Sequence, residues 1–306
     1  MRLNDAHCHF FSRRFFETLA RDDPRGRFTE APVETVCKTL EWDPPGAGNE
    51  LVTRWVAALD HHRVSRAALI ASVPGDESSV ADAVRHAPDR FVGFFMVNPL
   101  AEGAVDRVGQ ALAGGLRTVC LFPAMHRYAL SDARAAAVIA AAAAADGAAL
   151  FVHCGVLTVG IRKKLGLPSR FDMRFGNPVD LHGIALDHPS LPIIVPHLGA
   201  GFFREALMLA DLCPNVVLDT SSSNHWMAYE PALTLVDVFR QALLVAGPSR
   251  LLFGTDSSFF PRGWNRPVFD AQFQAVRQLG VPDPDIAQIF GGNFDRLFPQ
   301  EPGARG

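Results

Sequence analysis

The stretch Ala149-Leu150-Phe151-Val152-His153 is a short apolar run that ends in a polar residue, and it shows the pattern that decides the fold. Similar runs recur along the chain, and stretches of helical composition separate them. This alternation is typical of βα units whose strands form a parallel sheet. Strands are expected at Leu3–His7, Arg66–Ala71, Phe91–Val97, Leu116–Phe122, Ala149–His153, Ile193–His197, Val216–Asp219 and Leu251–Thr255.

Eight successive parallel strands favour a closed barrel. We therefore expect an α/β fold, a single (β/α)8 TIM barrel that spans residues 1–306 as one domain, because such barrels often reach this length. Helices are expected at Glu50–His62, Ser78–Ala87, Ala101–Ala113, Ser131–Asp146, Phe202–Leu212, Leu233–Ala246 and Phe269–Leu279.

Two connections are longer than a barrel needs. They cover residues 10–49 after the first strand and 155–189 after the fifth, and both contain proline, glycine, aromatic residues and arginine. Loops that follow the carboxyl ends of barrel strands build the active-site face. We expect these extended loops to form a lid and to shape the substrate site.

Composition excludes several classes of protein. The chain is 48% hydrophobic and 20% charged, with a formal net charge of −3, as in an ordinary soluble protein. It has no run of lysine or arginine that would bind nucleic acid or an anionic membrane. No secretory signal is visible, and the apolar stretch from Ala133 to Ala145 is too short to span a bilayer.

Cysteine usage predicts the compartment. The five cysteines are odd in number and scattered, with no CxxC pair, which argues against a disulfide framework and against a thiolate zinc site. Reduced thiols fit a cytoplasmic protein. A homodimer is left open.

The first strand carries two histidines, His7 and His9, separated by one residue. Side chains alternate across a strand, so both imidazoles project to the same side and can chelate a metal. Alone this pair is a weak signal, because two partly buried, hydrogen-bonded histidines would show the same spacing.

Three other strand ends repeat this chemistry. His153 closes the fifth strand, His197 the sixth, and Asp256 follows the eighth. The carboxyl ends of barrel strands meet at one face, and imidazole and carboxylate are ligands that suit zinc and similar divalent ions. The sequence therefore predicts a metal centre at this face.

The same motifs resemble the amidohydrolase superfamily over nearly the whole chain. The resemblance is narrower to an amidohydrolase-related branch that includes aminocarboxymuconate semialdehyde decarboxylase, aromatic acid decarboxylases, oxalomesaconate hydratase and lactone hydrolases. The stretches that carry it are Phe151-Val152-His153-Cys154-Gly155, Pro196-His197-Leu198-Gly199-Ala200-Gly201, Gly254-Thr255-Asp256 and Gly291-Gly292-Asn293-Phe294-Asp295-Arg296-Leu297-Phe298.

The resemblance implies a division of roles among these residues. His7, His9, His153 and Asp256 would bind one divalent metal ion, with zinc preferred and manganese as the alternative. His197 would act beside the metal as a base or an electrophilic helper, and Asp256 would also exchange a proton with water. A metal lowers the pKa of bound water to about 7, so this chemistry works near neutrality.

One position departs from the superfamily. Many members carry a lysine on the fourth strand, whose carbamate bridges two metals, but this chain has Cys120 in the corresponding run Thr118–Phe122. Cysteine cannot be carbamylated, so a single metal is favoured. A thiolate bridge stays open, although a small buried core residue is the better interpretation of Cys120.

Four residues near strand ends are candidates for contact with a small organic acid substrate: Arg262, His126, Arg127 and His225. An arginine recognises a carboxylate through paired donors, so Arg262, a few residues after Asp256, could orient such a substrate. Arginines at barrel rims also make structural ion pairs, and this alternative applies to both arginines.

The preferred function is a metal-dependent hydrolase that acts on a lactone, amide or ester of a small organic acid. The alternative is a nonoxidative decarboxylase or hydratase that uses the same metal on an aromatic or unsaturated carboxylic acid. Fold and ligands barely separate the two, since function depends on the loops. A barrel that binds without catalysis would be expected to lack His197 or Asp256, and this chain has both.

Overall fold

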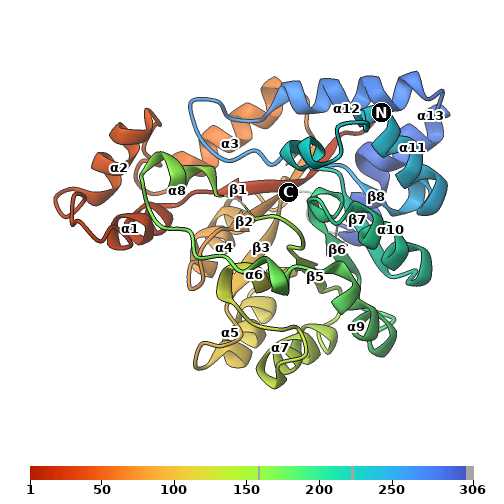
Figure 1. The fold of residues 1–306 in the computed structure, drawn as a ribbon. Helices are drawn as coiled ribbons and strands as arrows, with labels where there is room; N and C mark the ends of the chain where they lie inside the picture. The colour runs from red at the N-terminus through yellow and green to blue at the C-terminus, as the bar shows by residue number, and fades with distance from the viewer. Residues whose placement is uncertain (158, 222–223, 301–306) are drawn as a thin grey trace.

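The computed structural model describes residues 1–157, 159–221 and 224–300, and its strands form one parallel sheet in sequential order (Figure 1). The expected strands are confirmed, although β1 extends to Phe10 and several later strands are shorter than expected. The strands are β1 (Asn4–Phe10), β2 (Arg66–Ala71), β3 (Phe91–Val97), β4 (Thr118–Leu121), β5 (Ala149–Val152), β6 (Ile193–Val195), β7 (Val216–Asp219) and β8 (Leu251–Leu252).

The sheet closes from the segment after β8 back to β1. Ala6 N donates to Phe253 O at 2.9 Å, and His9 N donates to Ser257 O at 2.7 Å. Cys8 and Ser257 form a parallel bridge between the same segments. The (β/α)8 barrel prediction is therefore confirmed.

Side chains fill the barrel in two layers because residues alternate along each strand. The inner layer contains large aromatic residues and small ones, and Phe294 from the C-terminal helix and Phe298 directly after it pack with this layer. Members of the inner layer include Ala6, Ile70, Phe94, Met96, Cys120, Phe151, Ile194 and Leu252. The outer layer lies between strands and helices and includes Cys8 and Cys154, which sit beside the histidines but face away from them.

Helices alternate with the strands around the barrel. Asp132 caps the alanine-rich helix by accepting a hydrogen bond from Arg134 N, and this helix ends at Ala143, earlier than expected. Thr234 and Asp237 form a capping box at the start of another. The helices that surround the barrel are α3 (Glu50–His61), α4 (Glu77–His86), α5 (Ala104–Ala113), α7 (Ala133–Ala143), α9 (His182–Asp187), α10 (Phe203–Leu212), α11 (Leu235–Val245), α12 (Arg266–Gln278), α13 (Asp283–Ala287) and α14 (Asn293–Leu297).

The two extended loops contain further short helices. They and the remaining connections hold α1 (Arg13–Arg21), α2 (Pro32–Leu40), α6 (Pro123–His126), α8 (Gly160–Lys164), the 3-10 turns η1 (Met173–Phe175), η2 (Pro178–Leu181), η3 (Pro196–Gly199), η4 (Asn224–Tyr229) and η5 (Pro248–Arg250), and the π-turn η6 (Gln288–Gly292).

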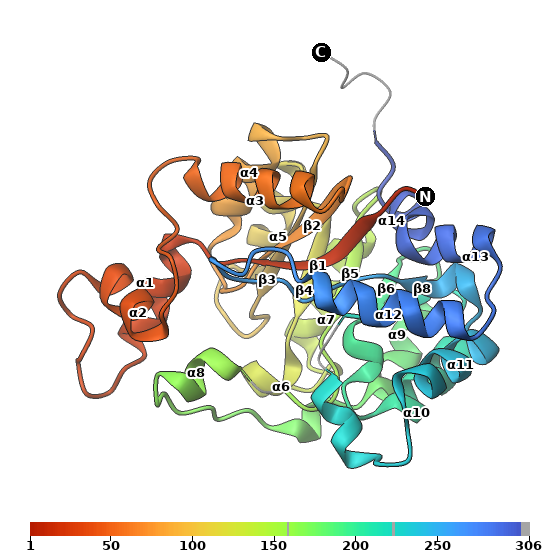
Figure 2. The same ribbon diagram turned by 90° about the horizontal axis from the view of Figure 1, so that it is seen from above.

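Helices α1, α2 and α8 form a unit that we call the cap. Both ribbon views show these helices to one side of the barrel (Figures 1 and 2). The two loops are joined by an ion pair of 2.6 Å between Arg162 and Asp22, and Arg27 Nη2 donates to Leu165 O at 2.6 Å. Phe15, Phe16, Leu19, Val33, Val36, Leu40, Ile161, Leu165 and Leu167 belong to the separate hydrophobic core of the cap.

In the part of the chain that the structure describes, no helix is both long and apolar enough to cross a membrane.

Candidate metal centre

Three potential ligand atoms meet at the carboxyl ends of the strands. His9 Nε2 lies 3.2 Å from Asp256 Oδ1 and 3.4 Å from His7 Nε2, and His7 Nε2 lies 3.7 Å from Asp256 Oδ1. All three ligand atoms lie within 4.8 Å of one another. The HxH spacing and the position of Asp256 after β8 account for this convergence.

The segment that carries Asp256 has an unusual backbone. Asp256 has a φ of 57°, in the left-handed region that non-glycine residues rarely adopt. Two residues earlier, a Cβ on Gly254 would lie 2.7 Å from Asp219 Oδ1 and 2.9 Å from His7 Cβ. Glycine at this position therefore lets the segment pass directly over the His7–Asp219 pair.

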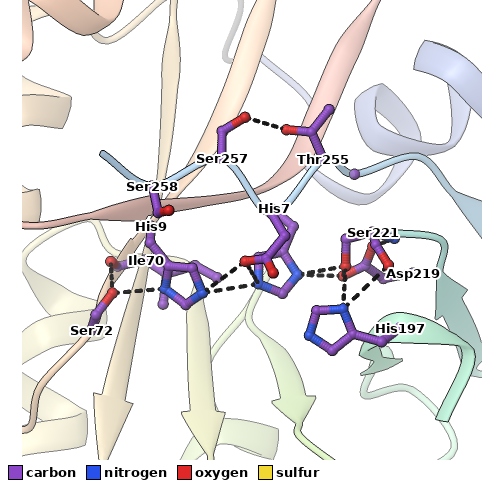
Figure 3. Close-up of polar contacts among 12 residues, drawn as sticks. His7, His9, Ile70, Ser72, His197, Asp219, Ser221, Thr255, Ser257 and Ser258 are labelled. Atoms are coloured by element: carbon purple, nitrogen blue, oxygen red, sulfur yellow. Dashed lines mark hydrogen bonds and ion pairs between the residues drawn. The ribbon is translucent and has the colours of Figure 1, made fainter. Parts of the chain in front are cut away.

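Hydrogen bonds fix which nitrogen of each histidine faces the centre (Figure 3). His7 Nδ1 lies 2.7 Å from Asp219 Oδ2, a carboxylate that accepts, so Nδ1 carries the proton and Nε2 keeps its lone pair. His9 Nδ1 lies 2.8 Å from Ser72 Oγ, whose own proton goes to Ile70 O at 3.0 Å. His9 Nε2 is therefore also free to bind a metal.

His197 lies beside this group in the turn η3. The sequence placed it at a strand end, but β6 ends at Val195, and His197 has a φ of 55°. Its ring centroid lies 4.9 Å from that of His7. Its Nδ1 lies 2.9 Å from Ser221 Oγ and 3.2 Å from Ser221 O, and a carbonyl only accepts. This orientation leaves Nε2 of His197 as the unprotonated nitrogen.

Asp219 and Ser221 join the two histidines into one network. Ser221 Oγ donates to Asp219 Oδ2 at 2.9 Å, and Ser221 N donates to Asp219 Oδ1 at 2.7 Å. Sequence reasoning assigned no role to either residue, or to Ser72. The available signal was that β7 ends in a carboxylate, as the segment after β8 does.

His153 occupies a different place from the other predicted ligands. It follows β5, stacks on Phe122 at 5.4 Å and lies 5.2 Å from His197, both between ring centroids. It is not part of the group formed by His7, His9 and Asp256. Its buried Nδ1 has no hydrogen-bond partner among the described residues, and such an atom fits metal binding. Its role as a ligand stays a prediction.

The electrostatic environment suits a cation. Burial raises the pKa of Asp256, but the close contact with His9 and the nearby histidines lower it well below its usual range. Burial and neighbouring imidazoles lower the pKa of His153 and His197, so both rings are neutral near pH 7. Burial acts to lower the pKa of His7, yet the charge and hydrogen bond of Asp219 outweigh it and raise that pKa.

Asp5 fastens the two segments that carry the ligands. Its buried carboxylate accepts hydrogen bonds from His7 N at 2.9 Å, Thr255 N at 3.1 Å, Thr255 Oγ1 at 2.5 Å and Trp264 Nε1 at 2.6 Å. Burial raises the pKa of Asp5 to about 6, although these hydrogen bonds oppose the rise. The carboxylate supplements the backbone hydrogen bonds between β1 and the segment after β8.

The candidate substrate residues differ in their surroundings. Arg262 is exposed, and its Nη2 donates to Ser258 Oγ at 3.1 Å and lies 3.4 Å from Asp256 O. Arg127 is exposed at the end of α6. Burial lowers the pKa of His126 to about 4, and its Nδ1 is without a partner in the described ranges. His225 belongs to η4, but its side chain lies outside the described residues.

Cys120 is a buried residue of the inner barrel layer, and burial raises the pKa of its thiol. It is not part of the metal-ligand group found among the described residues. Two imidazole nitrogens with fixed tautomers and a deprotonated carboxylate suit one divalent ion. His153 would complete the coordination of that ion.

A parallel barrel with imidazoles and a carboxylate gathered at its carboxyl face is the architecture of metal-dependent TIM-barrel enzymes. Residues 4–300 match the model of the amidohydrolase family. The chain belongs to this family, and it is an enzyme.

Among curated proteins, the chain is similar to Protein fluG of Emericella nidulans, with 29% identity over 126 residues. The match covers 40% of this chain and only 14% of Protein fluG.

Solved structures share the fold at low sequence identity. They include 5-carboxyvanillate decarboxylase LigW2 of Novosphingobium aromaticivorans with bound manganese (17% identity, TM-score 0.66, 97% of each chain covered). An amidohydrolase of Burkholderia multivorans with bound zinc has 16% identity and a TM-score of 0.61, with 97% of this chain and 99% of that chain covered. A probable 2-pyrone-4,6-dicarboxylic acid hydrolase of Acinetobacter baumannii, with citric acid bound, has 15% identity, the same TM-score of 0.61 and the same coverage of 97% and 99%.

Proposed function

We propose that this enzyme is a metal-dependent hydrolase that acts on a lactone, amide or ester of a small organic acid. One divalent ion would be held by His7, His9 and Asp256, with His153 as a fourth ligand. The observation that carries this proposal is that three ligand atoms lie within 4.8 Å of one another. In both histidines of this group, Nδ1 is hydrogen-bonded to another residue, which leaves Nε2 for the metal.

A divalent ion, when bound, lowers the pKa of coordinated water to about 7 and polarises a carbonyl oxygen. The side chains around it would supply the remaining chemistry. Asp256 remains ionised, so its carboxylate can accept a proton from water. His197, with Nδ1 tied to Ser221, presents a neutral Nε2 that can take up or return a proton beside the substrate.

A second candidate is a nonoxidative decarboxylase or hydratase. It is supported by the finding that the solved structures of similar fold include a decarboxylase as well as a probable pyrone hydrolase. In this reaction the same ligands would hold an ion that binds the substrate's carboxylate or hydroxyl. His197 would take up a proton at Nε2 from that hydroxyl or from water and return it to the carbon that loses carbon dioxide. A shared fold does not separate the two reactions, so hydrolysis remains the first proposal.

A substrate screen separates the two reactions. Lactones, esters and aromatic or unsaturated dicarboxylic acids would be incubated with the metal-loaded enzyme, and ring-opened or cleaved product would be measured separately from carbon dioxide. Product without carbon dioxide supports the hydrolase. Stoichiometric carbon dioxide with no cleavage of a lactone or ester supports the decarboxylase instead, and the His197→Ala enzyme serves as the blank for both.

We further infer zinc as the ion, with manganese as the alternative, and a single domain over residues 1–306. Cytoplasmic location is supported by the cysteines, because all five are buried and free.

Arg262→Ala is expected to raise KM for an acid substrate about tenfold while kcat changes much less. The guanidinium lies beside Asp256 O and makes no ion pair within the described part of the chain, so it can hold a substrate carboxylate. Such a contact stabilises ground state and transition state alike. Steady-state kinetics with the acid and with a neutral analogue would measure the effect.

The neutral analogue is the control, since its KM should be the same in both proteins. If the wild-type and Arg262→Ala proteins showed the same ratio of KM between the acid and the neutral analogue, Arg262 would have only a structural role at the barrel rim. Arg127 would then be the next candidate. The two extended loops also contain Arg13 and Arg174, but these already pair with Glu34 and Asp172.

A further inference from the structure

Four side chains in loops that follow the carboxyl ends of strands form a column. Lys164 Nζ lies 5.8 Å from the ring centroid of Trp42, Trp42 stacks on Phe259 at 4.1 Å with an interplanar angle of 4°, and Arg262 Cζ lies 4.4 Å from the Phe259 ring. We call these residues the aromatic column. Each ring of this stacked pair thus has a cation near it, a contact that the negative faces of aromatic rings favour, and Phe11 also stacks on Trp42 at 6.0 Å.

The column joins loops that follow three different strands. Lys164 lies in α8 after β5, Trp42 follows α2 in the loop after β1, and Phe259 and Arg262 lie in the loop after β8. A backbone hydrogen bond of 2.9 Å from Asp43 N to Phe260 O reinforces the contact at its centre. Trp42 also packs on the cap core, so it connects the cap to the loop after β8.

One end of the column lies at the metal centre. Arg262 Nη2 is 3.4 Å from Asp256 O and 3.1 Å from Ser258 Oγ, while the guanidinium rests on Phe259. An exposed arginine loses rotational freedom when it binds a ligand, and a guanidinium already held on a ring loses less. The position of Arg262 therefore depends on the position of Phe259.

Phe259 depends in turn on Trp42. Both rings are half-buried, and Trp42 covers one face of Phe259 while Arg262 lies over the ring. Loss of the indole would expose that face to water. The Asp43–Phe260 hydrogen bond and the packing of Phe260 on Trp55 would remain, but they hold Phe260 and not the Phe259 ring. The loop, and Arg262 with it, would then sample more positions.

We propose that Trp42 is a positioning residue, which holds Arg262 beside the metal centre through Phe259 and so makes the cap a determinant of carboxylate recognition. This rests on the proposed function only where it assigns a substrate carboxylate to Arg262. The claim that Trp42 positions Arg262 depends only on the contacts within the aromatic column.

The experiment compares Trp42→Ala, Trp42→Phe, Arg262→Ala and the double variant Trp42→Ala/Arg262→Ala in the full chain with zinc bound. Phe28→Ala is the matched control, because Phe28 is a buried ring of the cap core that is not part of the column. One readout is the rate of trypsin cleavage after Arg262, followed by mass spectrometry relative to cleavage after Arg240 on α11. The other is the affinity for isophthalate and for neutral isophthalamide, measured by calorimetry.

Trp42→Ala should speed cleavage after Arg262 about three- to tenfold, and Trp42→Phe should restore most of the protection. Phe28→Ala should leave this rate unchanged. Trp42→Ala should also weaken isophthalate binding about as much as Arg262→Ala does, spare isophthalamide, and add little in the double variant.

Unchanged cleavage in Trp42→Ala would overturn the proposal, whether or not isophthalate binds. Equal weakening of isophthalate and isophthalamide binding in Trp42→Ala would also overturn it, because Trp42 would then contact the ligand directly. A third outcome is faster cleavage in Trp42→Ala together with unchanged isophthalate affinity in both Trp42→Ala and Arg262→Ala. It would support the effect of Trp42 on the position of Arg262 and overturn the carboxylate role of Arg262.

Discussion

His9→Ala is expected to lose the metal and the activity together while the barrel stays folded. His9 Nε2 is one of the three ligand atoms, and its side chain is 20% exposed, so its removal leaves no large buried cavity. Loss of a residue that hydrogen-bonds to a metal ligand lowers metal affinity ~10–100-fold, and loss of the ligand itself should lower it more. Metal content after dialysis, activity and the thermal midpoint would be measured on the same preparation.

His7→Ala should lose metal equally but should also lower stability. Asp219 is fully buried, and without the imidazole it would lose a donor, at a cost of about 1–3 kcal/mol. Asp219→Asn should give the intermediate result of ~10–100-fold weaker metal binding, because His7 remains but its tautomer is no longer fixed.

Cys8→Ala is the matched control for this series, since Cys8 lies between the two histidines but packs in the outer layer. It should retain the metal. A His9→Ala protein that keeps both metal and activity would remove His9 from the centre and leave the HxH pair as two hydrogen-bonded histidines.

His197→Ala is expected to keep most of the metal and to lose turnover by ~10²–10⁴-fold. His197 presents a neutral Nε2 beside the ligand group, with Nδ1 held by Ser221, and this is the arrangement of a group that moves protons. Its ring contacts His7 but is not part of the ligand group. Metal analysis and kcat on the same sample separate the two roles.

Ser221→Ala serves as the graded control, because Ser221 O still accepts from His197 Nδ1 when the hydroxyl is gone. Its loss of kcat should be smaller than that of His197→Ala. If metal content in His197→Ala falls as steeply as in His9→Ala, His197 is a ligand and the division of roles is wrong.

The fold could be predicted from the sequence because a barrel repeats one local pattern. Strands such as Phe91–Val97 are continuous apolar runs, and the helices between them show amphipathic spacing, so each unit carries its own signal. His7 and His9 could be placed because strand alternation fixes the side on which a side chain projects.

The fine geometry of the site could not be read in this way. His197 and Asp256 adopt left-handed backbone conformations, which depend on neighbouring segments and leave no periodic pattern. Asp219 and Ser72 act by orienting a histidine from another strand, so their roles appear only when the strands lie side by side. Trp42 and Phe259 stack although they lie 217 positions apart in the sequence.

Metal analysis of protein purified without chelator is the most direct test of the central claim. We expect about one equivalent of divalent metal per chain. A chelator should remove both the metal and the activity, and addition of zinc or manganese should restore both. A protein that is fully active with no bound metal would contradict the account.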